Sequence, residues 1–324
     1  MNRGKMRAQA AGPSRLCEVT LTHFGAFRGC VFSCSPGLNV VTGMNGTGKT
    51  HLLKLVYAGL RHWSGTPFDQ ALPDLLLAPG EGIDRLLFRD PLVREGTVSF
   101  RTDSGAWAFR LETSGSRGKT ARVHLQSDPG SPVPQAFLFP LEELPEGRGN
   151  GRPHPLTKPL IAEVEKAMPG RVVVRGRRLK IANARGEIGI SLVTPVVRQL
   201  GLLSLLLRRG RMGPGSVLLW DIPEADAGPT FMGQIAELLL SFQRSGIQVI
   251  VATRDYVLLK EIDLLRKTGD LVRYHSLFRD EREDRIRVSE SDDFPGISPN
   301  PASEAFRSLF DRDVDRALSR LGIP

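Results

Sequence analysis

An octapeptide at residues 43–50 carries the residue types that bind a phosphate chain. It reads Gly-Met-Asn-Gly-Thr-Gly-Lys-Thr and matches the pattern G-x-x-x-x-G-K-[ST] at every defined position. Its glycines let the backbone wind with the N–H groups pointing inward, Lys49 is expected to reach the β- and γ-phosphates, and the Thr50 hydroxyl is expected to bind Mg²⁺. The residues that we expect to contact a nucleotide are Gly43, Met44, Asn45, Gly46, Thr47, Gly48, Lys49, Thr50 and His51.

The segments on either side of the octapeptide predict a strand and a helix. Leu38–Thr42 is a short apolar run typical of a buried strand, and His51–Ala58 has the apolar spacing of a helix. A phosphate-binding loop needs this context, because the amino end of the helix then points its N–H groups at the ligand. The alternative is a glycine-rich turn that matches the pattern by chance.

Asp221 is the candidate for the second group that holds Mg²⁺, through the water shell of the ion. It follows the apolar run Val217–Trp220, so it lies at the carboxyl end of an expected buried strand. Ligands of open α/β sheets bind at this end of the strands. We therefore expect adjacent parallel strands to place Asp221 beside Thr50, and these two residues to bind the metal.

The composition is that of a globular chain without an export or membrane signal. Of the 324 residues, 40% are hydrophobic and 24% are charged, and no apolar run approaches the length of a membrane span. The N-terminus has basic residues but no apolar core of a signal peptide, which predicts a cytoplasmic protein. Cys17, Cys30 and Cys34 predict free thiols rather than a disulfide framework, and no second Cys/His pair completes a metal site.

Positive charge is concentrated in the first part of the chain. The formal net charge is +9, and residues 1–61 hold eight Lys/Arg residues against one acid, Glu18. A basic surface can bind nucleic acid electrostatically, but solvated charge explains the same composition. The same two interpretations stay open for a basic cluster on an expected hairpin, formed by Arg171, Arg175, Arg177, Arg178 and Lys180.

The order of expected elements predicts an α/β fold with a mainly parallel central sheet and an N-terminal antiparallel β lobe. We expect a disordered tail at residues 1–14 and one domain at residues 15–324. That domain divides into a part with the phosphate loop (15–61), an inserted β-rich arm region (62–190) and a part with the Asp221 strand (191–324). The expected strands are Leu16–Thr22, Ala26–Ser33, Gly96–Arg101, Ala106–Glu112, Ala121–Leu125, Gln135–Phe139, Arg171–Val174, Arg177–Ile181, Ser216–Asp221 and Gln248–Thr253. The other expected helices are Leu160–Ala167, Pro195–Arg209 and Met232–Arg244, and Leu144–Pro159 is expected to be a loop.

Two parts of the sequence resemble the RecF/SMC-like branch of ABC-type ATPases. Leu16–Ala58 resembles the N-terminal half of that group through Thr22–Phe27, Pro36–Asn39 and the octapeptide. Trp220–Ala225 and Gly246–Thr253 resemble the C-terminal half, where an apolar run leads to Asp-Glu-Pro-Glu and a later strand ends in Thr-His.

The last part of the chain is similar, at Tyr274–Phe278 and Leu309–Arg312, to bacterial stand-alone members often labelled AAA-family ATPases. The resemblance implies a P-loop NTPase fold with ATP and Mg²⁺ as cofactors. It also implies an ATP-dependent homodimer, joined head to tail around the nucleotide.

Three departures from the family pattern concern hydrolysis. Ile222 stands where the family has the glutamate that orients or deprotonates the attacking water, and Arg254 stands in place of the γ-phosphate-sensing histidine. Val193-Thr194-Pro195 occupies the place of the glycine-rich signature loop, although Thr194 as N-cap and Pro195 at the first helical position suit a helix start. The expected catalytic residues are Lys49, Asp221 and, as the remaining nearby carboxylate, Glu224.

Two functions from different classes therefore remain open. The first is an ATP-binding, RecF-like ATPase with weak or lost hydrolysis, active in DNA maintenance or phage defence. The second is a non-hydrolysing, nucleotide-sensing regulatory or scaffold protein. Loss of a positioned general base costs about 10²–10⁴-fold in rate, which favours the second. Nucleic acid and an unidentified effector protein are the other expected partners, and a membrane is not.

Overall fold

The computed structural model describes residues 14–78, 81–90, 92–114, 120–127, 133–140, 151–176, 178–225, 227–280 and 282–320. A central sheet organises these residues, with the strand order β14-β13-β3-β12-β11-β7. All neighbours are parallel except β14, which pairs antiparallel with β13. The strands are β3 (Leu38–Gly43), β7 (Ala136–Phe139), β11 (Val217–Asp221), β12 (Gln248–Ala252), β13 (Val272–Asp280) and β14 (Arg285–Ser291).

Strands β3 and β12 are buried at every residue, as is β11 as far as Trp220. Continuous apolar runs of this kind belong to parallel strands that are covered on both faces. Alternate residues of the runs enter different cores. In β11, Leu219 lies in the core beneath the antiparallel lobe, whereas Leu218 and Trp220 lie in the core on the opposite side.

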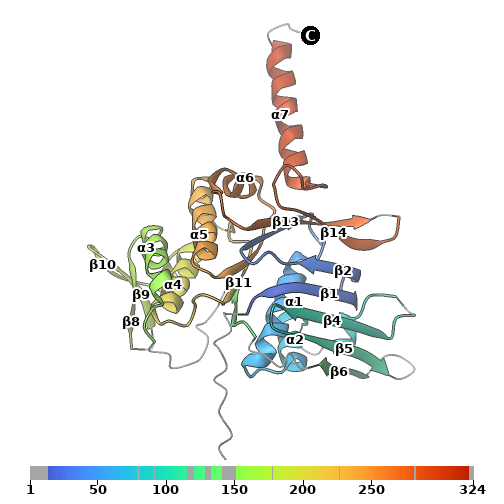
Figure 1. The fold of residues 1–324 in the computed structure, drawn as a ribbon. Helices are drawn as coiled ribbons and strands as arrows, with labels where there is room; N and C mark the ends of the chain where they lie inside the picture. Colours follow the sequence, from blue (N-terminus) through green and yellow to red (C-terminus); the bar gives the residue numbers. More distant parts are fainter. Residues whose placement is uncertain are drawn as a thin grey trace, which may run out of the picture.

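A second, antiparallel sheet has the order β2-β1-β4-β5-β6 and forms the lobe beside the central sheet (Figure 1). Its strands are β1 (Leu16–Phe24), β2 (Phe27–Ser33), β4 (Glu95–Thr102), β5 (Ala106–Ser114) and β6 (Thr120–Ser127). Helices α1 (Lys49–Arg61) and α2 (Phe68–Leu76) belong to its core. A close contact across this core joins α1 to β4, where Phe100 packs against the backbone of Gly59.

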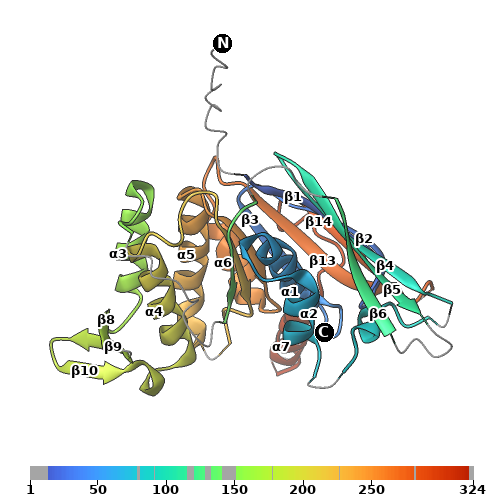
Figure 2. The same cartoon turned by 90° about the horizontal axis from the view of Figure 1, so that it is seen from below.

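The opposite face of the central sheet is covered by α5 (Met232–Arg244) and α6 (Tyr256–Leu265), as Figure 2 shows. Farther out lies an arm made of α3 (Lys158–Lys166), β8 (Arg171–Arg175), β9 (Arg178–Asn183), β10 (Gly186–Gly189) and α4 (Pro195–Arg208). Helix α7 (Pro301–Arg320) extends away from the body and has no buried residue (Figure 1). Short 3₁₀ turns cover His62–Ser64, Ile83–Leu86, Pro155–Thr157, Ile190–Leu192 and Pro229–Phe231.

The predicted fold class is confirmed: a mainly parallel central sheet, an antiparallel lobe and a small α/β arm. Residues 62–190, expected as one inserted region, are distributed over all three parts. Strands β4–β6 extend the sheet of β1, β7 is the edge strand of the central sheet, and only α3 and β8–β10 form the arm with α4. The division of the chain at residues 61 and 190 stays a prediction.

Several elements were not predicted, namely α2, β10, α6, β14 and α7, and β13 was expected only as a sequence motif. The expected tail lies outside the described residues except for Ser14, whose hydroxyl hydrogen-bonds to Ser104. Residues 144–150 of the expected loop and Arg177 of the basic cluster also lie outside them. The three cysteines are free thiols, as predicted. None of the helices in the described part of the chain combines the length and apolar composition that a bilayer-spanning helix needs.

Candidate nucleotide-binding site

The glycine-rich loop joins β3 to α1, as the strand–loop–helix prediction requires. Gly43, Gly46 and Gly48 have φ values of +141°, +79° and +89°, a region that other residues rarely adopt. A Cβ atom on Gly43 would lie 2.1 Å from the Leu277 carbonyl oxygen, and one on Gly48 would lie 2.8 Å from the Phe27 ring. The backbone of this loop therefore depends on glycine, both for its conformation and for its close contacts.

Lys49 is the first residue of α1, and its side chain folds back over the loop. The Nζ atom donates hydrogen bonds of 2.7 Å to the Gly43 carbonyl and 2.8 Å to the Met44 carbonyl. The residue is 9% exposed, and burial lowers the pKa of Lys49, while the Asp221 carboxylate opposes this shift. The ammonium group is thus held at the floor of the loop, in the place from which a lysine can reach a bound phosphate.

Thr50 and Asp221 are brought into direct contact. The Thr50 hydroxyl donates a 2.8 Å hydrogen bond to one carboxylate oxygen of Asp221, and the other oxygen, Oδ1, is buried without a hydrogen-bond partner among the described residues. Burial raises the pKa of Asp221, and the bond from Thr50 partly offsets this effect. A hydroxyl and a carboxylate with an unused oxygen are hard oxygen ligands of the kind that Mg²⁺ prefers.

One detail of the sequence prediction was wrong. The strands that carry the loop and Asp221 are not adjacent, because β12 lies between β3 and β11. Helix α1 closes the gap, since it packs against β11 as well as β12 and brings Thr50 over the end of β11.

Ile222 and Glu224 follow Asp221 but differ in their surroundings. Ile222 has a φ of +50°, a genuine outlier for a β-branched residue, and lines the cavity above the loop. Glu224 instead turns toward the end of β12. Its Oε1 accepts hydrogen bonds of 2.7 Å from the Thr253 hydroxyl and 3.2 Å from the Arg254 amide. Burial raises the pKa of Glu224, and the bond from Thr253 opposes the shift.

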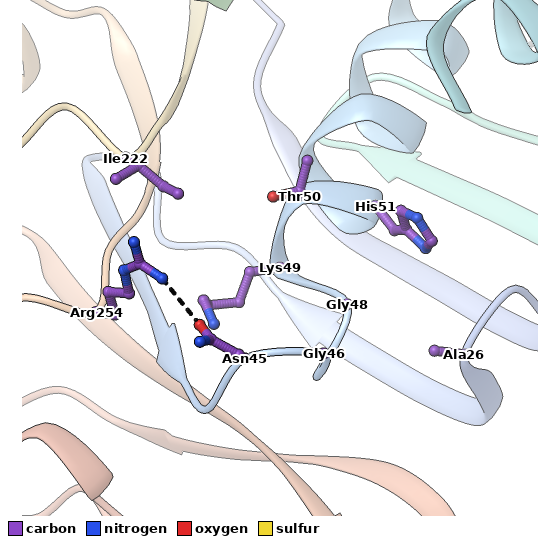
Figure 3. A pocket seen from close by; sticks show the side chains of 9 residues that line it. All are labelled: Ala26, Asn45, Gly46, Gly48, Lys49, Thr50, His51, Ile222 and Arg254. Carbon is purple, nitrogen blue, oxygen red and sulfur yellow. Dashed lines mark hydrogen bonds between the residues drawn. The ribbon is translucent and has the colours of Figure 1, made fainter. Parts of the chain in front are cut away.

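A cavity of about 260 Å³ lies directly above the loop (Figure 3). Arg254 and Ile222 lie on one side and His51 with Ala26 on the other, with Lys49 between them. The Arg254 guanidinium donates a 3.1 Å hydrogen bond to the side-chain oxygen of Asn45, a contact that the sequence did not predict. The lining residues are Ala26, Asn45, Gly46, Gly48, Lys49, Thr50, His51, Ile222 and Arg254.

Thr194 is the N-cap of α4 and Pro195 is its first residue, as predicted, but the Thr194 side chain forms no capping hydrogen bond. In the basic cluster, Arg175 and Lys180 both form ion pairs with Glu187 of β10. Part of the positive charge that one of the two interpretations assigned to nucleic-acid contact is therefore neutralised within the arm. Among the residues that the structure describes, no three His, Cys, Asp or Glu side chains gather as an all-protein metal site.

Comparison with known proteins supports the resemblance found in the sequence. No protein-family model matches the chain. A DNA replication and repair protein RecF from Idiomarina loihiensis is 32% identical over 143 residues, which cover 41% of this chain and 35% of that protein. The chain thus aligns with little more than a third of the length of this curated relative.

Solved SMC head domains have the same fold. A head bound to the C-terminal winged-helix domain of ScpA gives a TM-score of 0.58 at 12% identity, covering 86% of this chain and 97% of that one. A head with an extended coiled coil, bound to a ScpA domain derived from Pyrococcus furiosus, gives 0.57 at 11%, covering 91% and 99%. The head from Thermotoga maritima gives 0.50 at 13%, covering 86% and 99%. The chain therefore has the fold of SMC head domains, and the sequence similarity to RecF that was predicted is confirmed over part of the chain.

Proposed function

We propose that this chain, which has the fold of an SMC head and sequence similarity to RecF, binds Mg-ATP at residues 43–50. One observation carries the proposal: the glycine loop, Lys49 and Thr50 line one cavity, and the Thr50 hydroxyl is bonded directly to the Asp221 carboxylate. The chemistry of these residues fits a bound phosphate chain and Mg²⁺. The loop has the positive φ angles that turn N–H groups toward an anion, and Asp221 keeps a buried oxygen without a partner in the described part of the chain.

Each of these residues has a proposed role. Lys49 and the loop amides bind the phosphates, and Thr50 and Asp221 hold Mg²⁺, directly and through its water shell respectively. When bound, the ion neutralises phosphate charge. His51 lines the cavity on the side opposite Arg254 and Ile222, with Lys49 between them.

We further propose that hydrolysis is weak or lost. Ile222 has no atom that can accept a proton from water, and the Glu224 oxygen Oε1 is engaged by Thr253 and Arg254. Its other oxygen, Oε2, is buried without a hydrogen-bond partner among the described residues, and Glu224 does not line the cavity above the loop, which makes it a poor general base in this arrangement. The second candidate function, a nucleotide-sensing regulator or scaffold, is favoured by this same observation.

The name of the RecF relative and the ScpA-bound SMC heads support a role in DNA maintenance. We therefore propose an effector protein as partner and DNA as the associated nucleic acid, with phage defence as the other setting. Nucleotide-dependent pairing of two chains belongs to the same proposal.

Titration calorimetry with ATP and Mg²⁺ tests the proposal on wild type, Lys49→Ala and the matched control Lys166→Ala. Lys166 is an exposed lysine of α3. We expect wild type and the control to bind ATP alike and Lys49→Ala to lose binding. Equal affinity of all three proteins would refute the site. Multiple-turnover phosphate release on the same samples separates an ATPase from a sensor.

A further inference from the structure

Helix α7 stands away from the body of the molecule and presents apolar side chains to solvent (Figure 1). Leu309 is 56% exposed, Phe310 is 61% exposed and Val314 is 38% exposed. At about 100° per residue these positions, together with Ala317, fall on one side of the helix and form an apolar stripe. Most helical stability in proteins comes from packing such a face against another element. The stripe therefore indicates a partner.

The base of α7 is fixed to the body, so the stripe is held in a defined direction. The Asn300 side chain accepts a 3.1 Å hydrogen bond from the Ser303 amide, which caps the start of the helix. The Phe306 ring then stacks on Tyr256 of α6, with the ring centroids 4.2 Å apart and an angle of 13° between the planes. From Leu309 onward, no residue of α7 is buried by the described part of the chain.

The charged side chains of α7 are distributed unequally about the stripe. By the same helical spacing, one side of the stripe is net acidic and the other is net basic. The acidic side has Glu304, Arg307 and Asp311, the basic side has Arg312, Asp313, Arg316 and Arg320, and Asp315 lies on the back of the helix. None of these side chains forms an ion pair within the residues that the structure describes. Their charges are therefore available to a partner.

We propose that α7 is a self-association surface, on which the α7 helix of a second copy of this chain packs in parallel, stripe against stripe. A two-fold axis along a parallel pair brings each side of one helix against the opposite side of the other, so the acidic side meets the basic side. In an antiparallel pair each side meets its own kind, and like charges repel. The charge pattern thus favours a second copy and the parallel direction. This inference goes beyond the proposed function, because the contact requires no nucleotide.

The size of the surface determines the strength of the association. Helix α7 has 20 residues and is therefore about 30 Å long, and α6 already contacts its base. A pair of such helices buries less than the roughly 1,200 Å² of a standard interface, which places it among weak complexes. We therefore expect a dissociation constant on the order of 0.1–1 mM. Any other contact between the same two chains would be strengthened by this one.

Sedimentation equilibrium of the full chain without nucleotide tests the stripe, at concentrations of about 0.05–0.5 mM that bracket the expected constant. We expect wild type to show a reversible dimer at the upper end of this range. Phe310→Glu places a charge in the centre of the stripe and is expected to stay monomeric throughout. The matched control is Leu92→Glu, since Leu92 is an 89% exposed leucine outside α7. It is expected to dimerise like wild type.

Charge reversal tests the parallel direction. Asp311→Lys makes the acidic side basic, and Arg316→Glu weakens the basic side, so each variant alone should dimerise about twofold to fivefold more weakly than wild type, the range for exposed ion pairs. An equimolar mixture of the two variants restores opposite charges on facing sides. We expect the mixture to reach a higher average mass than either variant alone at the same total concentration.

A wild type that stays monomeric over the whole range would overturn the inference and leave the stripe to a helix of another protein. Equal dimerisation of wild type and Phe310→Glu would overturn it as well, as would equal weakening by Leu92→Glu. If Phe310→Glu is monomeric but charge reversal has no effect, the parallel arrangement is wrong. Each of these results leaves the proposed function standing, because no nucleotide is present in the experiment.

Discussion

The Thr50 hydroxyl donates a 2.8 Å hydrogen bond to Asp221, although the strand that leads to Thr50 and the strand that ends in Asp221 are not neighbours. Strand β12 separates them, and α1 packs against the face of the sheet over β12 and β11, which brings the two side chains together. One hydrogen bond therefore depends on the packing of α1 against four strands, β3, β7, β11 and β12. Strand β12, which lies between these two strands, is followed by Arg254, which lines the cavity.

The Thr50–Asp221 pair predicts how ATP binding depends on the metal. Asp221→Asn keeps an acceptor for the Thr50 hydroxyl but loses the charge that holds the water shell of Mg²⁺. Loss of an outer-sphere partner of this kind lowers metal affinity about 10–100-fold. We expect the gain in ATP affinity on adding Mg²⁺ to shrink accordingly, while affinity in EDTA is unchanged. Calorimetry in both buffers, with Asp315→Asn as a surface control, measures this, and an undiminished gain would contradict the role of Asp221.

The same substitution predicts a pH-dependent gain in stability. Burial raises the pKa of Asp221 above its unfolded value, so the folded state binds the proton more tightly. Stability therefore falls as pH rises from the unfolded pKa through the raised folded pKa, and the loss persists above it. The asparagine side chain cannot ionise, so Asp221→Asn should melt above wild type at neutral pH, and the difference should vanish at acidic pH. Thermal melts across this range decide it, and a constant difference would argue against the cause given.

Ile222 predicts the outcome of restoring an acid beside Asp221. Ile222→Glu introduces a proton acceptor on the cavity side of the loop, and a positioned general base contributes about 10²–10⁴-fold. We expect phosphate release to rise in Ile222→Glu but not in the uncharged control Ile222→Gln. Multiple-turnover assays compare the two at equal ATP occupancy. Equal rates would mean that the missing carboxylate is not what limits hydrolysis.

The loop and Asp221 could be predicted because their neighbours are continuous apolar runs, which show a buried strand in the sequence itself. The hydrogen bond between Asn45 and Arg254 could not be predicted from the sequence. It depends on the order of strands in the sheet, and parallel strands far apart in sequence leave no local record of which ones are neighbours. The insertion of β12 between β3 and β11 was missed for this reason.

Elements with weak local patterns were also missed. Helix α7 buries none of its residues and exposes Phe306, Leu309 and Phe310, so its sequence lacks a continuous buried stripe. Strands β4–β6 were predicted individually, but alternation of apolar residues cannot tell which sheet a strand joins. The pairing of β4 with β1, which adds β5 and β6 to the same sheet, made the lobe larger than the sequence suggested.

A glycine pair in two helices predicts opposite effects of the same substitution. Alanine is favoured over glycine by about 0.8–1.0 kcal/mol in a helix interior, the position of Gly59 in α1, and the gain is smaller in a first turn, the position of Gly233 in α5. In α1, however, a Cβ on Gly59 would lie 2.1 Å from the Phe100 ring, whereas in α5 a Cβ on Gly233 finds its nearest atom, in Glu261, at 3.4 Å. Gly59→Ala should therefore lower the melting temperature and Gly233→Ala should raise it. Calorimetric melts test both, and stabilisation by Gly59→Ala would show that α1 and β4 are less tightly packed than described.

The start of α4 predicts how two chains associate. If two copies pair head to tail around ATP, the amino end of α4 faces the terminal phosphate held by the other copy, and the helix dipole favours that contact by about 0.3–1 kcal/mol. Pro195 opposes it, because it offers no N–H and adds bulk at the first helical position. We expect Mg-ATP to raise the mass measured by light scattering at tens of micromolar protein, and Pro195→Ser to strengthen this response by supplying an N–H. A monomer mass for both proteins, with ATP shown to be bound, would contradict pairing and leave the nucleotide-sensing scaffold as the function that fits this site.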